Sequence, residues 1–196
     1  MKLLLVLLLA GGALASWRPE PDCDDYTCPS GFQMFDRADT GTWCIKVVTD
    51  KKTWWEAEKE CRCKYGATLS GIESDVEHKY ILNELQKGGV SGAVWIGAYR
   101  RAACRGPVGN WRSKSECTNE YMFQFTDYNA RGRYIFSKWQ SNEPTSQIRG
   151  NEQENCVAMN VSPNSGSIKD EFCSAQNIGF VCGVSAEGKK YGASRP

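Results

Sequence analysis

The chain of 196 residues carries 24 basic and 23 acidic side chains, which gives a formal net charge of +1 at pH 7. This balance argues against nucleic acid or an anionic membrane surface as a general partner, so no nucleic-acid binding is expected. Ten cysteines occur with one histidine and without a C-x-x-C pair. In a secreted chain this pattern favours a disulfide framework over zinc ligation.

The first fifteen residues predict the location of the protein. Lys2 precedes an unbroken apolar run at residues 3–9, and residues 13–15 have the A-x-A form of a cleavage site. The run is too short for a membrane-spanning helix, which needs about 20 apolar residues. Residues 1–15 are therefore predicted to be a secretory signal peptide, and the mature protein to be extracellular, without membrane insertion.

Three further segments are expected after cleavage. Residues 16–27 contain two prolines and several acids and are predicted to be an extended lead-in, tied down by Cys23. Residues 28–184 form the single domain. Residues 185–196 are rich in Gly, Lys and Ser and are predicted to be a flexible tail.

The first predicted helix follows Thr53-Trp-Trp-Glu56, which has the form of a capping box. The Thr53 hydroxyl can cap the amide of Glu56, and the Glu56 carboxylate can reach back. Gly66 is the expected stop. The residues expected on its buried face are Trp54, Ala57 and Cys61.

The second predicted helix follows a second capping box, Ser74-Asp-Val-Glu77, and ends at Gly88-Gly89. The single histidine, His78, is expected to be a surface residue on this helix. The apolar stripe is expected to contain Val76, Tyr80 and Leu85.

Strands are expected in the second half, where short apolar runs stand between long polar stretches. The predicted strands are residues 94–97, 123–125, 156–159 and 179–182. The polar stretches 126–155 and 160–172 are interpreted as loops that are functional or held by cross-links.

Seven features in order make residues 28–183 resemble a C-type lectin domain. They are Ala57…Cys61 with Gly66-Ala67-Thr68-Leu69, Trp95-Ile96-Gly97-Ala98, Phe125-Thr126-Asp127, Trp139 before Asn142-Glu143-Pro144-Thr145, Glu154-Asn155-Cys156-Val157, Asp170-Glu171-Phe172-Cys173 and Phe180-Val181-Cys182. The resemblance implies an α+β fold with two helices, small antiparallel sheets and a long loop region, stapled by disulfides.

The resemblance also implies the cysteine pairs. Those expected are Cys61–Cys182, Cys156–Cys173, Cys28–Cys44 in the hairpin of the long form of the domain, and Cys104–Cys117 across a polar insertion. Cys23 and Cys63 are left over, and their pairing rests on arithmetic alone.

A calcium and sugar site is implied at the family's ligand positions. Calcium takes six to eight oxygen ligands, and in this family vicinal sugar hydroxyls complete its shell. Glu143, Glu154 and Asp170 match the family's carboxylates, and Pro144 matches its cis-proline. Thr145 stands where Asn is usual. The Glu-Pro pair implies a mannose- or glucose-type glycan.

Lys169 also stands where Asn is usual, and an ammonium group cannot be a ligand because it has no acceptor. Two hypotheses therefore stay open. In the first, the protein is a calcium-dependent carbohydrate-binding lectin that uses Glu143, Thr145, Glu154 and Asp170. In the second, it is a calcium-independent lectin-like module for a protein or other non-sugar ligand, with Lys169 in place of the cation.

No enzyme is expected, because neither G-x-S-x-G nor H-E-x-x-H occurs. Asn160 begins an N-x-S glycosylation sequon that Pro163 follows. Arg131, Arg133 and Arg149 put positive charge in the long loops; they are expected to be solvated, although an acidic glycan could use them. Host defence, as part of innate immunity, would be typical of a small secreted member of this family.

Overall fold

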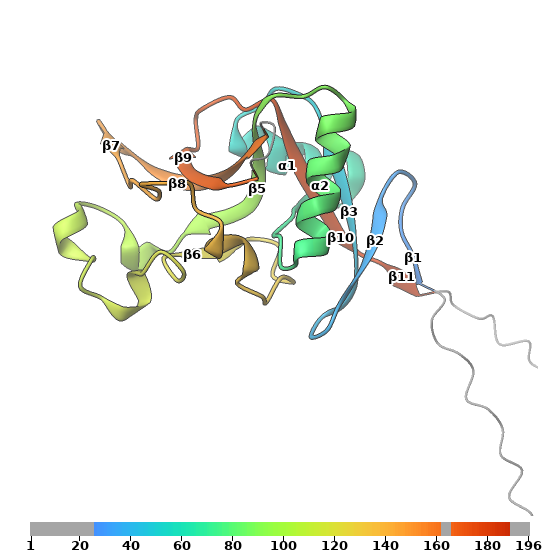
Figure 1. The fold of residues 1–196 in the computed structure, drawn as a ribbon, viewed down its shortest axis with the longest axis horizontal. Coiled ribbons are helices and arrows are strands. Elements are labelled where there is room, and N and C mark those ends of the chain that lie inside the picture. The colour runs from blue at the N-terminus through green and yellow to red at the C-terminus, as the bar shows by residue number, and fades with distance from the viewer. Residues whose placement is uncertain (1–25, 162–165, 189–196) are drawn as a thin grey trace, which may run out of the picture.

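The computed structural model describes residues 26–161 and 166–188, so the predicted signal peptide and Cys23 lie outside the described residues. The described chain forms two α-helices, several short 3₁₀ helices and two sheets (Figure 1). The strands are β1 (Tyr26–Thr27), β2 (Gln33–Arg37), β3 (Gly41–Val48), β4 (Thr68–Leu69), β5 (Gly92–Arg100), β6 (Phe123–Phe125), β7 (Ile148–Arg149), β8 (Glu152–Val161), β9 (Ile168–Phe172), β10 (Gly179–Ser185) and β11 (Glu187–Gly188). The helices are α1 (Trp54–Tyr65) and α2 (Asp75–Lys87), with 3₁₀ helices η1 (Ala102–Cys104), η2 (Val108–Asn110), η3 (Ser115–Cys117) and η4 (Tyr134–Ser137). The expected α+β class is confirmed.

The larger sheet has the strand order β2-β3-β10-β5-β8-β7, with β4, β6 and β9 paired to β10, β5 and β8. All four predicted strands occur within it. The sheet is mixed rather than antiparallel, because β10 runs parallel to β5, with Phe180 opposite Trp95. Strand β10 lies between β3 and β5, which come earlier in the chain, and no hairpin connects it to either, so the connection does not fix its direction.

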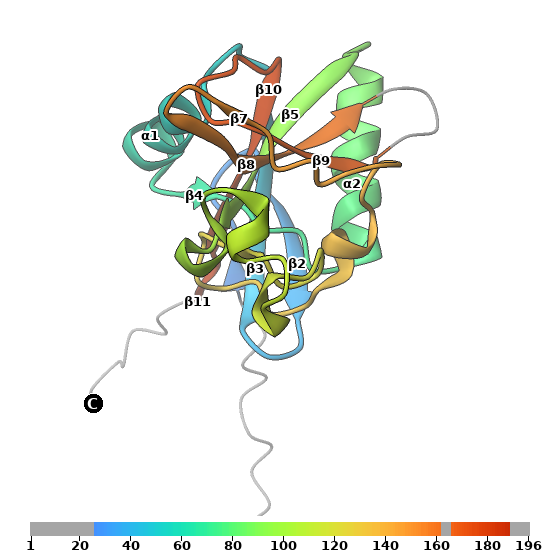
Figure 2. The same cartoon turned by 90° about the vertical axis from the view of Figure 1, so that its left-hand side faces the viewer.

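The two helices cover opposite faces of this sheet (Figure 2). Successive side chains of a strand point to opposite faces, so β5 contributes to two cores. Val94 and Ile96 pack with Ile81 and Leu85 of α2, whereas Trp95 packs with α1. The strand is hydrophobic without alternation because both of its faces are covered.

Helix α1 forms as its sequence predicts. Thr53 Oγ1 accepts from the Glu56 amide at 3.3 Å, and Glu56 Oε2 accepts from the Thr53 amide at 2.9 Å. Gly66 ends the helix in the left-handed conformation, with φ of 61°, which glycine adopts without steric cost. The expected face of Trp54, Ala57 and Cys61 is buried.

Helix α2 begins at the predicted cap, Ser74, but its buried face differs from the expected one. Val76 is 67% exposed, and the buried residues are Glu77, His78, Ile81 and Leu85. The surface position expected for His78 is therefore wrong. The helix turns this face inward because Glu77 makes a buried ion pair with Arg37, 2.8 Å long, instead of closing the capping box.

Four disulfides join the expected cysteines, and these pairings are confirmed. They are Cys28–Cys44, Cys61–Cys182, Cys104–Cys117 and Cys156–Cys173. Within the part of the chain that the structure describes, Cys63 is an exposed free cysteine.

The predicted flexible tail begins too early. Strand β10 includes Ser185, and β11 pairs with β1, where Tyr26 lies opposite Gly188. This two-stranded sheet ties the end of the domain to the lead-in. Residues 189–196 lie outside the described residues. Within residues 26–161 and 166–188, no helix has the length and apolar character that crossing a membrane requires.

Candidate functional site

The four residues predicted at the site come together around Thr145. Its amide lies 3.1 Å from Glu143 Oε2 and 2.9 Å from Asp170 Oδ1. Its hydroxyl donates to Glu154 Oε2 at 2.6 Å. The Glu143–Pro144 peptide bond is cis, as expected. Three segments distant in sequence therefore place three carboxyl groups about one threonine.

Loop amides supply further donors to the same carboxylates. The Ser146 amide lies 2.9 Å from Asp170 Oδ2, and the Gln147 amide lies 2.7 Å from Glu154 Oε2. Backbone donors of this kind stabilise the ionised form of a carboxylate and fix its orientation. The loop after the cis bond thus wraps its own N–H groups around the acids.

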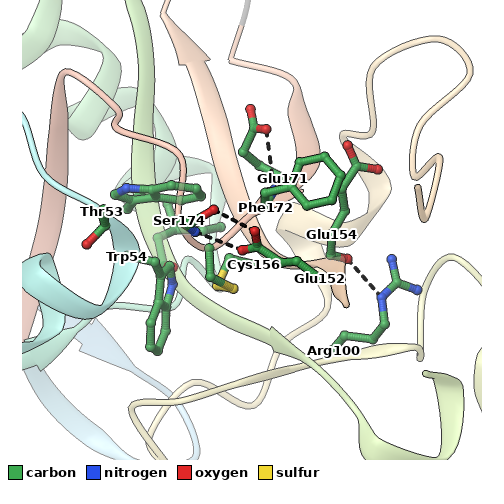
Figure 3. Close-up of a disulfide and its surroundings, with 12 residues drawn as sticks. Thr53, Trp54, Arg100, Glu152, Glu154, Cys156, Glu171, Phe172 and Ser174 are labelled. Carbon is green, nitrogen blue, oxygen red and sulfur yellow. Dashed lines mark hydrogen bonds between the residues drawn. A yellow bond between two sulfur atoms is a disulfide. The ribbon is translucent and has the colours of Figure 1, made fainter. Parts of the chain in front are cut away.

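A cation that the sequence did not point to, Arg100, lies against Asp170. The Arg100 Nη2 to Asp170 Oδ2 distance is 2.5 Å, and both side chains are 0% exposed. Arg100 Nε also donates to the backbone carbonyl of Glu154 at 3.0 Å (Figure 3). Burial lowers the pKa of the Arg100 guanidinium to about 10, opposed by the charges of Asp170 and Glu154. The guanidinium is still protonated at neutral pH.

The polar insertion explains how Arg100 is shielded from water. The guanidinium carbon lies 4.4 Å from the ring centroid of Phe123 and 5.5 Å from that of Trp111. Trp111 belongs to the insertion that the Cys104–Cys117 disulfide closes, and its indole N–H donates to the Gly106 carbonyl at 2.9 Å. Aromatic faces attract a cation and exclude water from it. Trp111 of the insertion and Phe123 of β6 therefore cover the guanidinium group of the ion pair.

Lys169 is placed elsewhere. Its ammonium group makes an ion pair with Glu171, on the same strand β9. Asp170 is buried while its two neighbours are half-buried, since alternate residues of a strand face opposite ways. The place that the second hypothesis gives to Lys169, next to Asp170, is taken by Arg100.

Burial changes the proton affinity of two of the acids. The pKa of Glu143 is raised to about 8, chiefly by burial and then by its hydrogen bond and like charge with Asp170. Burial also raises the pKa of Glu154. At neutral pH the Glu143 carboxyl group therefore carries a proton for most of the time, which lowers the negative charge of the site.

These residues do not fit a calcium ion. Calcium needs six to eight oxygens free to face it, whereas the bonded oxygens of Asp170 and Glu154 already accept from Thr145, loop amides and Arg100. The buried positive charge of Arg100 would repel a second cation at this distance. Over the described residues, no group of three or more His, Cys, Asp or Glu side chains is arranged to hold a metal.

The remaining predicted residues lie away from this cluster. Asn160 is half-buried in β8, where its side-chain amide donates to Gln140 Oε1 at 2.6 Å. Ser162 and Pro163 of its sequon lie outside the described residues, so glycosylation stays a prediction. Arg149 lies over the Phe172 ring, 4.7 Å from its centroid.

Comparison with known proteins gives a family match. Residues 34–184 match the family model described as C-type lectin domain-containing protein 141/158. The chain is 25% identical over 156 residues to lithostathine-2 of Mus musculus, covering 79% of this chain and 73% of the relative. It is 29% identical over 161 residues to C-type lectin BML-1 of Bungarus multicinctus, covering 80% and 83%.

Solved structures show the same fold. A calcium-independent type II antifreeze protein has a TM-score of 0.56 and 23% identity, with 83% of this chain and 97% of that chain covered. The carbohydrate-recognition domain of cow CD23, solved in the presence of a GlcNAc2Man3 oligosaccharide, has a TM-score of 0.56 and 24% identity, with 83% and 98% covered. Because the family match spans residues 34–184, most of the chain, the protein belongs to the C-type lectin domain family.

Proposed function

We propose that the protein is a secreted, calcium-independent lectin-like protein that binds a glycan through the surface of its long loops. The observation that carries this proposal is the buried ion pair between Arg100 and Asp170. In this family, Asp170 matches a calcium ligand. Here a guanidinium group supplies the positive charge that the carboxylate needs.

The charges of the site support independence from calcium. Arg100 contributes one positive charge, and the raised pKa of Glu143 leaves that carboxyl group largely neutral at pH 7. Arg100 therefore offsets one of the two remaining carboxylate charges, those of Asp170 and Glu154, and the loop amides keep both acids in place. The loop conformation should be the same with and without the ion.

Secretion and a binding role rest on separate observations. The predicted signal peptide and the four disulfides are typical of a protein that folds in an oxidising compartment. The one histidine, His78, is buried, with its ring nitrogens 3.1 Å from Tyr134 Oη and 2.8 Å from the Gly166 carbonyl oxygen. This environment supports a structural role for His78 rather than a catalytic one.

A calcium-dependent lectin is the second candidate, because Glu143, Glu154 and Asp170 do converge next to a cis-proline. For calcium to bind there, Arg100 would have to leave a site in which it is 0% exposed. The cost of moving a buried charge away from its partner makes this the weaker proposal.

A glycan array distinguishes the two candidates. The mature protein is applied once with calcium and once with a chelator, and the bound glycans are compared. We expect the same glycans to be retained in both conditions. Loss of all signal in chelator would favour the calcium-dependent lectin, and absence of signal in both conditions would favour a protein ligand.

A further inference from the structure

A cleft of about 340 Å³ lies beside β6, away from the carboxylates around Thr145, and three arginines surround it. The residues that line it are Arg101, Gln124, Phe125, Tyr128, Ala130, Arg131 and Arg133. None of them is acidic. A cleft lined by charges of one sign concentrates its field and attracts an ion of the opposite sign.

Arg133 is held in a fixed position in this cleft. Its Nη1 donates to the carbonyl oxygens of Glu120 and Phe123, at 3.2 and 3.0 Å, and its guanidinium lies 5.0 Å from the Tyr121 ring centroid. Burial lowers its pKa, and the nearby positive charge of Arg101 lowers it further. Two guanidinium groups thus repel each other across the cleft.

Arg101 carries a donor without a partner. Its Nε is buried and makes no hydrogen bond. Within residues 26–161 and 166–188, none of the three cleft arginines makes an ion pair. A buried donor without an acceptor is costly and uncommon in folded proteins, so it indicates a missing partner.

Two acids with contacts to neighbouring loop residues, Glu73 and Asp127, are engaged elsewhere. Glu73 Oε2 accepts from the backbone amide of Arg131 at 2.8 Å, rather than from its side chain. Asp127 accepts from the Gly71 amide at 2.8 Å and lies 3.5 Å from Arg37. Neither carboxylate therefore pairs with a cleft arginine, and Glu120, whose charge acts on the pKa of Arg133, makes no ion pair with it within residues 26–161 and 166–188.

Tyr128 adds an aromatic surface at the edge of the cleft. It is 87% exposed, the most exposed of the large hydrophobic side chains in the described residues, and its backbone has φ of 55°. A bulky residue in the left-handed region is strained, and such strain is usually retained for function. An exposed tyrosine ring beside polar donors suits the apolar face of a sugar ring.

We propose that this cleft binds an acidic saccharide, with its carboxylate or sulfate ester on Arg101, Arg131 and Arg133 and its ring against Tyr128. The forked donors of arginine match the oxygens of either anion. This proposal rests on the proposed glycan binding by the long loops, but not on the charge state of the carboxylates around Thr145, which do not line the cleft. Arg100 and Arg101 are adjacent in sequence, yet one is bonded to Asp170 and the other lines the cleft.

Calorimetric titration of the mature protein in chelator and low salt tests this inference. The probes are N-acetylneuraminic acid and an O-sulfated N-acetylglucosamine, with neutral N-acetylglucosamine and inorganic sulfate as comparisons. We expect at least one acidic sugar to bind more tightly than either comparison, and the better of the two identifies the anion. Absence of binding by both acidic sugars, or equal binding of neutral sugar or inorganic sulfate, would overturn the proposal.

Substitutions in the cleft test whether the acidic sugar binds there. Arg101→Gln and the exposed Arg131→Gln should each weaken binding of the acidic sugar about tenfold, the effect of losing one charge-assisted hydrogen bond. Tyr128→Asn, which tolerates a positive φ, should weaken sugar binding without preventing folding. Arg62→Gln on α1 is the matched control, because it removes the same charge from a side chain that is 67% exposed and outside the cleft. An equal loss in Arg62→Gln would show diffuse attraction and refute a defined site.

Discussion

The buried pair of Arg100 and Asp170 gives a stability prediction that can be worked from the structure. Replacing Arg100 by methionine leaves the Asp170 carboxylate buried with two loop amides but without its cation. Removing one partner of a buried ion pair typically costs about 3–5 kcal/mol. The lost contacts with the Phe123 and Trp111 rings act in the same direction. We therefore expect Arg100→Met to lose about 4 kcal/mol of unfolding free energy.

Urea unfolding with the disulfides intact measures this loss. Asp170→Asn should cost a similar amount, because it leaves the guanidinium without a counter-ion. The double variant should lose much less than the sum of the single losses, since each single change already breaks the pair. The exposed Arg62→Met is the control and should change stability by less than about 0.5 kcal/mol. A loss below about 1 kcal/mol for Arg100→Met, or additive losses in the double variant, would refute this role of the pair.

Three further outcomes are expected. The folded pKa of Glu143 is about 8, above its ordinary value of 4.5. The stability that this group contributes is therefore fully present below pH 4.5 and is lost as the pH rises from there through 8; stability curves should show this loss in the wild type and not in Glu143→Gln. Burial lowers the pKa of His78, so its contribution is lost as the pH falls below its ordinary value of 6.5; His78→Gln should weaken that acid dependence, and an unchanged curve would contradict it. Replacing Cys61 and Cys182 by serine opens a link across 121 residues and should cost about 5 kcal/mol, which calorimetry measures against the intact protein; a cost below about 2 kcal/mol would contradict it.

Much of the fold could be predicted from local signals in the sequence. The capping box at Thr53 and the apolar runs of β5 and β10 depend on neighbouring residues, and each is observed where it was expected. The face of α2 could not be predicted in this way. It turns on the ion pair between Glu77 and Arg37, which are 40 residues apart.

Strand β9 was missed for a related reason. Its inward-facing residues are Ile168, Asp170 and Phe172, so a charge interrupts the apolar alternation that indicates a strand. That charge is stabilised in the core by Arg100 and by the loop amides of Thr145 and Ser146. When the burial of a charged residue depends on a partner distant in sequence, the local sequence does not show the apolar alternation that predicts a strand.

The candidate site, too, could be predicted from the sequence only in part. The family resemblance predicts that Glu143, Thr145, Glu154 and Asp170 form one site. In the structure, Thr145 hydrogen-bonds to all three acids. The resemblance gave no reason to include Arg100, which the family pattern does not contain. A charged residue at the end of the buried strand 92–100 was the available signal, since such a residue needs a counter-ion.

Thermal unfolding with calcium tests most directly whether Arg100 takes the place of the ion. A site with a dissociation constant of about 1 mM would gain about 1.4 kcal/mol of stability in about 10 mM calcium. For a domain of this size, that gain would raise the melting temperature by about 3–5 °C. We expect the wild type to melt at the same temperature in calcium and in chelator. A rise of that size in calcium, abolished by Asp170→Asn, would contradict the replacement of calcium by Arg100.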